Sequence, residues 1–438
     1  MKEPVSSSRA TTDPGASTFE ATHAHALARD RADTLARFRH EFAIPRHDDG
    51  SQAIYFCGDS LGLQPLRAER YVVDELHTWR DVAVRGHFEP PRPWLSYHEL
   101  VTDGLARLVG AEPREVVAMN SLTVNLHLML ATFYRPTAAR FKILMEDHAF
   151  PSDAYAVASH VATRGLDPDR AIVRVAPRPG EERLNHDDIE AAIAREGNAL
   201  ALVLWPGVQY YSGQAFDLAA IVAAGHRHGA RVGFDLAHAA GNLVLALHDW
   251  HADFACWCSY KYMNAGPGAV AGCFVHAAHV ANRGLPRLAG WWGHDSATRF
   301  RMGPDFDPMP TADGWQLSNP PILSLAPLRA SLELFDEAGI ASLRAKSVTL
   351  TGFLEYLLNR RMGDQIEIVT PSDPEARGCQ LSIRVRSGLP GRELHARVER
   401  AGVACDFREP NVVRVAPTPL YNTFDEVYRF VDILAGCV

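Results

Sequence analysis

Two residues near the middle of the chain could carry out chemistry on an amino compound. Lys261 follows the apolar run CWCSY (256–260), and Asp235 follows the apolar run ARVGF (230–234). A lysine at the end of a buried strand loses its proton readily and can then form a Schiff base. A carboxylate beside it could keep the ring nitrogen of a pyridinium cofactor protonated, so that the ring accepts electrons. The pair therefore predicts a site for such a cofactor.

Each of these residues has a simpler interpretation, which the sequence leaves open. Lys261 could be a surface cation just past a strand, and Asp235 could cap a helix over 235–241. His238, one helical turn after Asp235, could contact the ring or be an ordinary half-buried histidine. For Lys261 the composition favours chemistry, because only four of the 44 lysines and arginines are lysine. These four are Lys2, Lys142, Lys261 and Lys346.

A third motif, NSLTVN (120–125), lies between a strand and a helix, where free backbone N–H groups could bind phosphate. Asn and Ser are also common helix caps, so this motif alone is a weak signal. The glycine-rich run AGPGAVAG (265–272) precedes a strand and so is not a dinucleotide-binding loop, and no G-x-S-x-G motif occurs. No metal site is predicted. Three close pairs of possible ligands occur, but none has a second pair nearby at the spacing of a zinc finger: His226/His228, His248/His251 and Cys256/Cys258.

Alternating strands and helices must position these residues. Runs that are apolar on both faces predict a mostly parallel sheet with helices on both sides, and ligands bind at the carboxyl edge of such sheets. Strands are expected at 115–120, 141–147, 171–177, 199–207, 230–238, 253–261 and 269–275, and early helices at 20–40 and 66–83. A smaller α+β part is predicted to follow, with a long helical pattern at 324–360, strands at IEIVTP, CQLSIRV and NVVRVAP, and helices at 391–401 and 424–436.

The chain divides into four predicted parts. Residues 1–18 are expected to be a disordered tail, because their composition buries too little apolar surface to offset the loss of chain entropy. Residues 19–60 are an N-terminal segment that packs with the small domain. Residues 61–315 form the large cofactor-binding domain, and residues 316–438 form the small C-terminal domain.

Composition excludes several classes of protein. The chain has 438 residues, 47% of them hydrophobic, which is enough to form a large hydrophobic core. A net charge of −8 without charge blocks argues against nucleic acid and anionic membranes, which leaves small molecules or a second copy as partners. No apolar run approaches the ~20 residues of a membrane span, and the first residues lack the apolar core of a signal peptide. Seven cysteines, mostly among apolar neighbours, are typical of reduced thiols, so a cytoplasmic protein is expected.

Six motifs resemble kynureninase, a pyridoxal-phosphate enzyme family of fold-type I that is similar to class V aminotransferases. They are YFCGDSLGLQP (55–65), GFDLAHAAGNLVLALHDWHADFACWCSYKYMNAGPG (233–268), GWWGH (290–294), LSNPPIL (317–323), RGCQL (377–381) and RVAPTPLYN (414–422). The resemblance runs from about residue 20 to the C-terminus. It implies pyridoxal 5'-phosphate as the cofactor, and a large domain with a mostly parallel sheet beside a smaller C-terminal α+β domain.

The resemblance also implies roles for individual residues. Lys261 would form the Schiff base, Asp235 would pair with the pyridinium nitrogen beside His238, and Arg414 would clamp the substrate α-carboxylate. The phosphate end would be bound by Leu122, Thr123, Tyr260 and Trp291. The ring would be wrapped by Phe150, Pro151, Ser152 and Asp153, with Phe150 stacked on its face. The aryl part of the substrate would be contacted by Ser60, His87 and Asn319, of which Asn319 would also contact the cofactor.

Two further implications concern the neighbouring subunit and a departure from the family. In the family Trp291 reaches the cofactor of the partner, so a homodimer is implied. Relatives can offer a hydroxyl to the cofactor just before Gly207, where this chain has Pro206 and therefore no side-chain donor.

The implied reaction is the hydrolytic cleavage of the Cβ–Cγ bond of L-kynurenine, or of its 3-hydroxy form. The products would be anthranilate, or 3-hydroxyanthranilate, and L-alanine, in tryptophan catabolism. Lys261 would take the α-proton, and Tyr260 would protonate the departing β-carbon. A class V aminotransferase or a cysteine desulfurase would share the fold and the lysine, but a desulfurase needs a reactive cysteine on a mobile loop. A non-enzymatic scaffold would have no reason to keep Lys261, Asp235 and Arg414 together.

Overall fold

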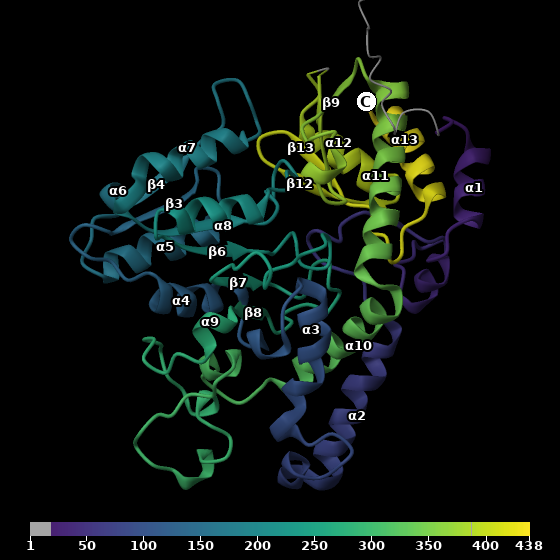
Figure 1. The fold of residues 1–438 in the computed structure, drawn as a ribbon. Helices are drawn as coiled ribbons and strands as arrows, with labels where there is room; N and C mark the ends of the chain where they lie inside the picture. Colours follow the sequence, from purple (N-terminus) through teal and green to yellow (C-terminus); the bar gives the residue numbers. More distant parts are fainter. Residues whose placement is uncertain (1–18, 387) are drawn as a thin grey trace, which may run out of the picture.

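A seven-stranded sheet forms the centre of the larger part of the molecule (Figure 1). The computed structural model describes residues 19–386 and 388–438, so the predicted tail, 1–18, lies outside the described residues. The strand order is β2-β8-β7-β6-β5-β3-β4; β7 to β4 run parallel, and β8 is antiparallel to β7 and to β2. The predicted mostly parallel α/β sheet is confirmed. Its strands are β2 (Val116–Ala118), β3 (Lys142–Glu146), β4 (Ile172–Val175), β5 (Leu200–Pro206), β6 (Arg231–Asp235), β7 (Phe254–Trp257) and β8 (Gly272–Val275).

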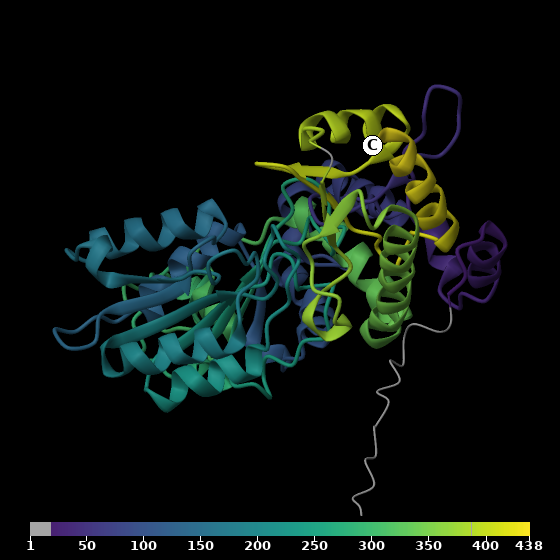
Figure 2. The ribbon, with the colours of Figure 1, turned by 90° about the horizontal axis from the view of Figure 1, so that it is seen from above.

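Helices cover both faces of this sheet (Figure 2). Alternate residues of a strand point to opposite faces, and in β3 Leu144 joins one core cluster while Ile143 and Met145 join the other. Burial on both faces explains why these strands are continuous apolar runs in the sequence. The covering helices are α3 (Thr102–Val109), α7 (His186–Glu196) and α8 (Leu218–Arg227) on the side of Leu144, and α4 (Leu122–Phe133) and α5 (Pro151–Thr163) on the other side.

The segment after β6 does not contain the helix over 235–241 that was one interpretation of Asp235, and the strand expected over 230–238 ends at Asp235. Residues 236–242 form consecutive turns, in which the N–H groups of Ala239 and Ala240 both donate to Leu236 O at 2.9 Å. Gly241 then adopts a φ of 78°, which stops helical continuation. Asp235 accepts instead from Ala237 N at 2.6 Å, so it shapes a tight turn rather than capping a helix.

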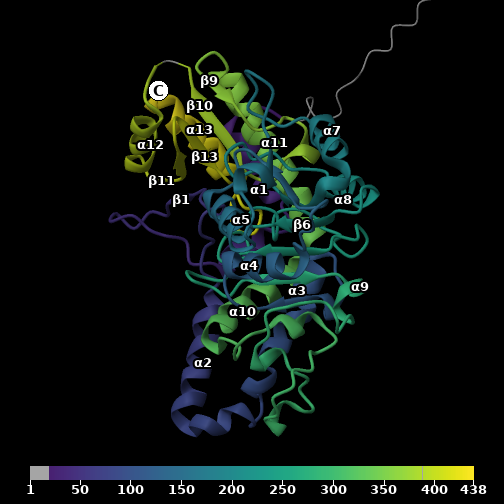
Figure 3. The same ribbon diagram turned by 90° about the vertical axis from the view of Figure 1, so that its left-hand side faces the viewer.

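The long helical pattern predicted over 324–360 is two helices. α10 (Ile322–Ala338) and α11 (Ile340–Met362) meet at Gly339, whose φ of 75° a residue without Cβ adopts without strain. α10 packs on α2 (Leu66–Val82), and α11 runs into the C-terminal part of the molecule (Figures 1 and 3). The pair therefore joins the two parts of the fold.

A four-stranded antiparallel sheet forms the smaller part, in the order β12-β13-β10-β9. Its apolar face packs with the surrounding helices in a separate core cluster. Two strands, β11 and β12, were missed by the sequence analysis because two or three residues are too few to show alternation. The elements are β9 (Ile366–Ile368), β10 (Leu381–Val385), α12 (Gly391–Arg400), β11 (Val403–Ala404), β12 (Asp406–Arg408), β13 (Val412–Val415) and α13 (Phe424–Cys437).

The N-terminal segment packs against the C-terminal part. α1 (His23–Arg31) lies on α13, whose first N–H groups, at Phe424 and Asp425, donate to the Asp30 carboxylate at 2.7 and 2.9 Å. β1 (Ile54–Tyr55) pairs in parallel with β11. The helix expected over 20–40 ends early, at Arg31, and a 3₁₀ helix follows at Ala36–Glu41.

The predicted domain boundaries at 60 and 315 stay a prediction. Among the described residues, no helix has the length and apolar character to cross a membrane.

Candidate active site

A cavity of about 350 Å³ opens at the carboxyl edge of the large sheet and is closed from the other side by β12 and β13. β3, β5 and β6 all end at this edge, since they run parallel. The structure brings together eleven residues singled out in the sequence, from segments far apart in the chain. They are Ser60, Leu122, Thr123, Phe150, Ser152, Asp153, Asp235, His238, Tyr260, Lys261 and Arg414.

Lys261 points its amine at His238. Lys261 Nζ lies 2.9 Å from His238 Nε2 and 5.8 Å from the centre of the Phe150 ring. Burial lowers the pKa of His238 well below its usual range, and the nearby cations Lys261 and Arg414 lower it further. The imidazole is therefore neutral, and Nε2 accepts a hydrogen bond from the lysine. This contact aims Nζ into the cavity.

Three carboxyl groups line the same cavity as the lysine. Asp235 ends β6, Glu146 ends β3, and Asp153 lies in the first turn of α5; all three are less than a tenth exposed. Burial raises the pKa of Glu146 to about 8 and, together with the Asp235 charge, raises that of Asp153 well above its usual range. Asp153 Oδ1 has no hydrogen-bond partner among the described residues. This acidic wall suits a cationic ring nitrogen, which would supply the missing donor.

Two helix N-termini face the cavity from the side of α4 and α5. Leu122 and Thr123 begin α4, whose N-cap Ser121 makes no side-chain capping bond, and Thr123 Oγ1 lies 2.6 Å from Ser152 Oγ. Unused N–H groups at a helix start attract anions such as phosphate. Tyr260 lines the same cavity, and burial raises the pKa of its phenol, so its O–H remains a donor.

Arg414 enters the cavity from β13, in the C-terminal part. Its side chain is 1% exposed, and Nη1 donates to Tyr210 O at 2.6 Å. Nη2 forms ion pairs with Asp59, at 3.1 Å, and with Asp406. A buried guanidinium in this position can bind a planar carboxylate through two parallel bonds.

Four cavity residues with polar side chains were missed by the sequence analysis: Asp59, Glu146, Tyr210 and Arg408. Glu146 ends β3 as Asp235 ends β6, so the rule that located Asp235 could have found it. Asp59 immediately precedes Ser60, which the resemblance placed at the aryl part of the substrate. Tyr210 and Arg408 come from a loop and from the unrecognised strand β12, and no sequence signal marks them.

Four predicted site residues lie outside this cavity in the single chain. Trp291 is 41% exposed, and its Nε1 donates to Arg299 O at 3.3 Å. Asn319 lines a separate hollow beside Asn120, and His87 packs edge-on against Trp94 with ring centres 5.4 Å apart. Pro151 is the first residue of α5 and does not line the cavity. Pro206, the departure noted in the sequence, does line it.

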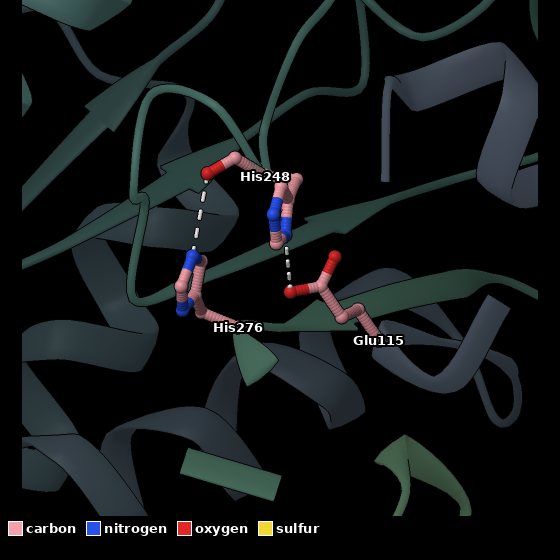
Figure 4. Close-up of side chains that lie close together, drawn as sticks. All are labelled: Glu115, His248 and His276. Atoms are coloured by element: carbon pink, nitrogen blue, oxygen red, sulfur yellow. Dashed lines mark hydrogen bonds and ion pairs between the residues drawn. The ribbon is translucent and has the colours of Figure 1, made fainter. Parts of the chain in front are cut away.

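A histidine cluster lies at the opposite edge of the sheet (Figure 4). Glu115 Oε1 accepts from His248 Nδ1 at 2.9 Å and from Ala277 N at 2.6 Å, and His276 Nε2 lies 3.3 Å from His248 O. The His248 and His276 rings stack with centres 5.2 Å apart and planes 10° apart. Parallel rings do not direct their nitrogens at a common point. The cluster therefore joins three chain segments by hydrogen bonds, which residue spacing could not show.

Comparisons with known proteins decide the family. A family model described as the kynureninase C-terminal domain matches residues 343–434. A curated kynureninase of Xanthomonas euvesicatoria pv. vesicatoria is 59% identical over 94% of this chain and 97% of its own length. Those of Myxococcus xanthus and Koribacter versatilis are 56% and 53% identical, each over 95% of this chain and 98% of its own length. The chain belongs to the kynureninase family.

Solved structures at low identity share the fold of this kynureninase family member. The cystine C–S lyase C-DES, with glycine linked to its PLP cofactor, has a TM-score of 0.73 at 20% identity and covers 91% of this chain and 98% of its own. A cysteine desulfurase of Thermococcus onnurineus NA1 has a TM-score of 0.72 at 17% identity, over 88% and 94%. The predicted fold-type I architecture is confirmed.

Pyridoxal 5'-phosphate is the cofactor of kynureninases, and the cavity fits it. The fit rests on the unpartnered Asp153 oxygen, on Asp235, on the two helix N-termini and on Lys261, which all face this one cavity. All seven cysteines are unpaired, and Cys258, which lines the cavity, is 4% exposed with a thiol pKa raised by burial. A neutral, buried thiol is a poor nucleophile, which disfavours desulfurase chemistry.

Proposed function

We propose that this chain hydrolyses the Cβ–Cγ bond of L-kynurenine, or of 3-hydroxy-L-kynurenine, to L-alanine and the corresponding anthranilate. One observation carries the proposal: in a member of the kynureninase family, Lys261, Asp235 and Arg414 line the same cavity, although they come from three distant segments. We place the reaction in tryptophan catabolism in the cytoplasm, which agrees with the unpaired cysteines.

Arg414 and Lys261 bind and deprotonate the amino acid. The Arg414 guanidinium binds the α-carboxylate, which places the α-carbon near Lys261 Nζ. When Nζ is not bonded to the cofactor, it is a free amine, and this amine takes the α-proton of the substrate. His238 Nε2, 2.9 Å from Nζ, holds this amine in position. Because its pKa is lowered, the imidazole is neutral and adds no positive charge to the cavity.

Asp235 keeps the cofactor ring nitrogen protonated. When bound, pyridoxal phosphate supplies a cationic ring that accepts the electrons of the bonds broken at the substrate. The carboxylate of Asp235 stabilises that ring charge, and the side chain of Asp153 lies close enough for their charges to interact. Thr123, Ser152 and the start of α4 hold the phosphate end.

Tyr260 is the acid that protonates the departing β-carbon. Burial raises the pKa of its phenol, so the hydroxyl keeps its proton near neutral pH. Water adds to the γ-carbonyl, whose aryl side faces Ser60 in the cavity. A second copy of the chain would supply Trp291, and we propose that His87 and Asn319 also complete the site in a homodimer.

Release of anthranilate by the purified holoenzyme tests the proposal. Fluorescence of anthranilate should appear with L-kynurenine, and the ratio of kcat/KM for the two kynurenines assigns the preferred substrate. Sulfide released from cysteine, or a keto acid formed from kynurenine, would instead favour the desulfurase or aminotransferase alternative. A holoenzyme inert toward both kynurenines contradicts the proposal.

A further inference from the structure

Arg414 is already engaged by two carboxylates of its own chain. Nη2 lies 3.1 Å from Asp59 Oδ2 and also pairs with Asp406 Oδ2, while Nη1 donates to Tyr210 O. The side chains of Arg414 and Asp59 are 1% and 0% exposed, yet both line the cavity. The group that we assign to the substrate carboxylate is therefore not free before the substrate arrives.

The two carboxylates are held differently. Asp406 Oδ1 also accepts from Arg408 Nη1 at 2.9 Å, so Asp406 keeps a partner without Arg414. Neither oxygen of Asp59 has a hydrogen-bond partner among the described residues, and its recorded ion pair is with Arg414. Asp59 is thus the carboxylate that an incoming anion can displace.

The buried, unpartnered edge of the guanidinium is where such an anion would bind once Asp59 has moved. Arg414 Nε has no partner among the described residues. A carboxylate binds a guanidinium edge through two parallel bonds, here to Nε and Nη2. Nη2 has two hydrogens and cannot serve three carboxylates at once, so a substrate on this edge takes the place of Asp59.

Displaced as an anion, Asp59 would be a buried charge without a partner, which is strongly unfavourable. As a neutral acid it avoids that cost and can donate its O–H to the incoming carboxylate. We propose that Asp59 stands in for the substrate carboxylate on Arg414, and that substrate binding is coupled to the uptake of one proton by Asp59. One carboxylate enters and one proton from solvent joins Asp59, so the net charge of the pocket does not change. This inference rests on the proposed role of Arg414.

Among the groups that contact Arg414, we assign the proton uptake to Asp59. Glu146, whose pKa burial raises to about 8, lines the same cavity but keeps its carboxyl group in Asp59→Asn, so that variant separates the two. Burial raises the pKa of the Asp59 carboxyl group, with Asp406 acting in the same sense and Arg414, Lys261 and Arg408 acting against it. The phenols and thiols whose charges would act on it are kept neutral near physiological pH, because burial raises the pKa of each. They are Tyr55, Cys57, Tyr262, Cys379 and Cys405.

Calorimetry on the holoenzyme can count this proton. The probe is desaminokynurenine, 4-(2-aminophenyl)-4-oxobutanoate, which keeps the carboxylate and the aryl ketone but has no α-amine. Titrations from about pH 6 to about pH 9, in buffers of different ionisation enthalpy, give the number of protons taken up. The wild type should take up about one proton at the alkaline end, where its affinity falls up to tenfold per pH unit. Asp59→Asn should bind the probe without this uptake.

Asp406→Asn is the matched control, because it removes the other carboxylate from Arg414 but leaves Asp59. Its proton uptake should persist, and Asp59→Ser replaces Asp59→Asn if the amide variant does not fold. The proposal would be overturned if the wild type bound the probe without proton uptake, or if Asp59→Asn still took up a proton. It would also be overturned if the probe bound neither the wild type nor the variants.

L-kynurenine hydrolysis, measured separately, keeps the two proposals apart. Uptake without hydrolysis contradicts only the proposed function, and hydrolysis without uptake contradicts only the role of Asp59.

Discussion

Lysine is rare in this chain, and each of the three lysines that the structure describes is held by one partner. Lys142 Nζ lies 2.7 Å from Glu196 and Lys346 Nζ lies 2.8 Å from Asp33, where both side chains are 7% exposed. Lys261 alone faces a cavity and a neutral histidine. Scarcity directed attention to Lys261, but it could not show that Lys346 is buried in an ion pair, because the partner lies more than 300 residues away in the chain.

Replacement of Lys261 should abolish both the cofactor signal and turnover. Without Nζ, Lys261→Ala has no amine to bind the cofactor or take the α-proton, and Lys261→Arg has a group that cannot lose its proton. We expect loss of the visible absorption of the bound cofactor and a fall in kcat of about 10²–10⁴-fold or more. Lys142→Ala, which breaks a partly buried ion pair that does not line the cavity, should keep both. Wild-type turnover in Lys261→Ala would show that the lysine is misassigned.

Glu146 should make the protein less stable as the pH rises. Burial raises its pKa from 4.5 to about 8, so between these values the folded protein holds a proton that the unfolded chain has lost. The free energy of unfolding should therefore be highest below about pH 4.5 on this account, and should fall by up to ~1.4 kcal/mol per unit until about pH 8. Urea unfolding at several pH values should show a smaller slope for Glu146→Gln. Equal slopes would mean that Glu146 is ionised in the folded protein.

At the scale of elements, the sequence predicted the strands of the large sheet well, because burial on both faces makes them continuous apolar runs. It placed Lys261 at a strand end, whereas β7 ends at Trp257 and Lys261 follows in a loop. It expected a strand over 230–238, but β6 ends at Asp235 and is followed by turns that end at Gly241. Cavity residues at strand ends can be predicted from the sequence. The positions of Arg408 and Tyr210 in the cavity depend on contacts between the two parts of the fold, which the sequence does not show.

Gly62 holds the loop before α2 against the segment that carries Lys261. Its N–H donates to Tyr260 O at 2.8 Å, and a Cβ at position 62 would lie 2.3 Å from both Lys261 O and Asn264 Oδ1. We expect Gly62→Ala to destabilise the protein by about 1–3 kcal/mol and to weaken cofactor binding, because the lysine segment must move. Melting temperature and cofactor titration measure the two effects. Gly303→Ala, with nothing within 4 Å of its Cβ, is the control.

At the scale of the whole molecule, the site is shared between two parts of the fold. The sequence and its family resemblance predicted this architecture, and the structure unites residues from Asp59 to Arg414 in one cavity. In the single chain, neither Trp291 nor Asn319 lines that cavity; each lines a separate hollow. Trp291 was singled out for a contact across a subunit boundary, which no pattern within one chain reveals.

Hybrid dimers should show whether Trp291 serves the partner's site. Lys261→Ala and Trp291→Ala chains, each nearly inactive alone, are co-purified with different tags as mixed dimers. If Trp291 acts across the interface, one of the two sites has both residues and turnover returns. If it acts within its own chain, neither site is complete and the mixture stays inactive. Sedimentation of the wild type as a monomer would contradict the homodimer itself.

The pairing of the two ends of the chain determines when this site can exist during synthesis. Asp59 and β1 leave the ribosome long before β11, with which β1 pairs, and before β13, which carries Arg414. A nascent chain therefore exposes Lys261 long before the guanidinium arrives to select a carboxylate. A product that terminates before β13 keeps the lysine and lacks the selecting group, so substrate discrimination is acquired only once β13 has been synthesised.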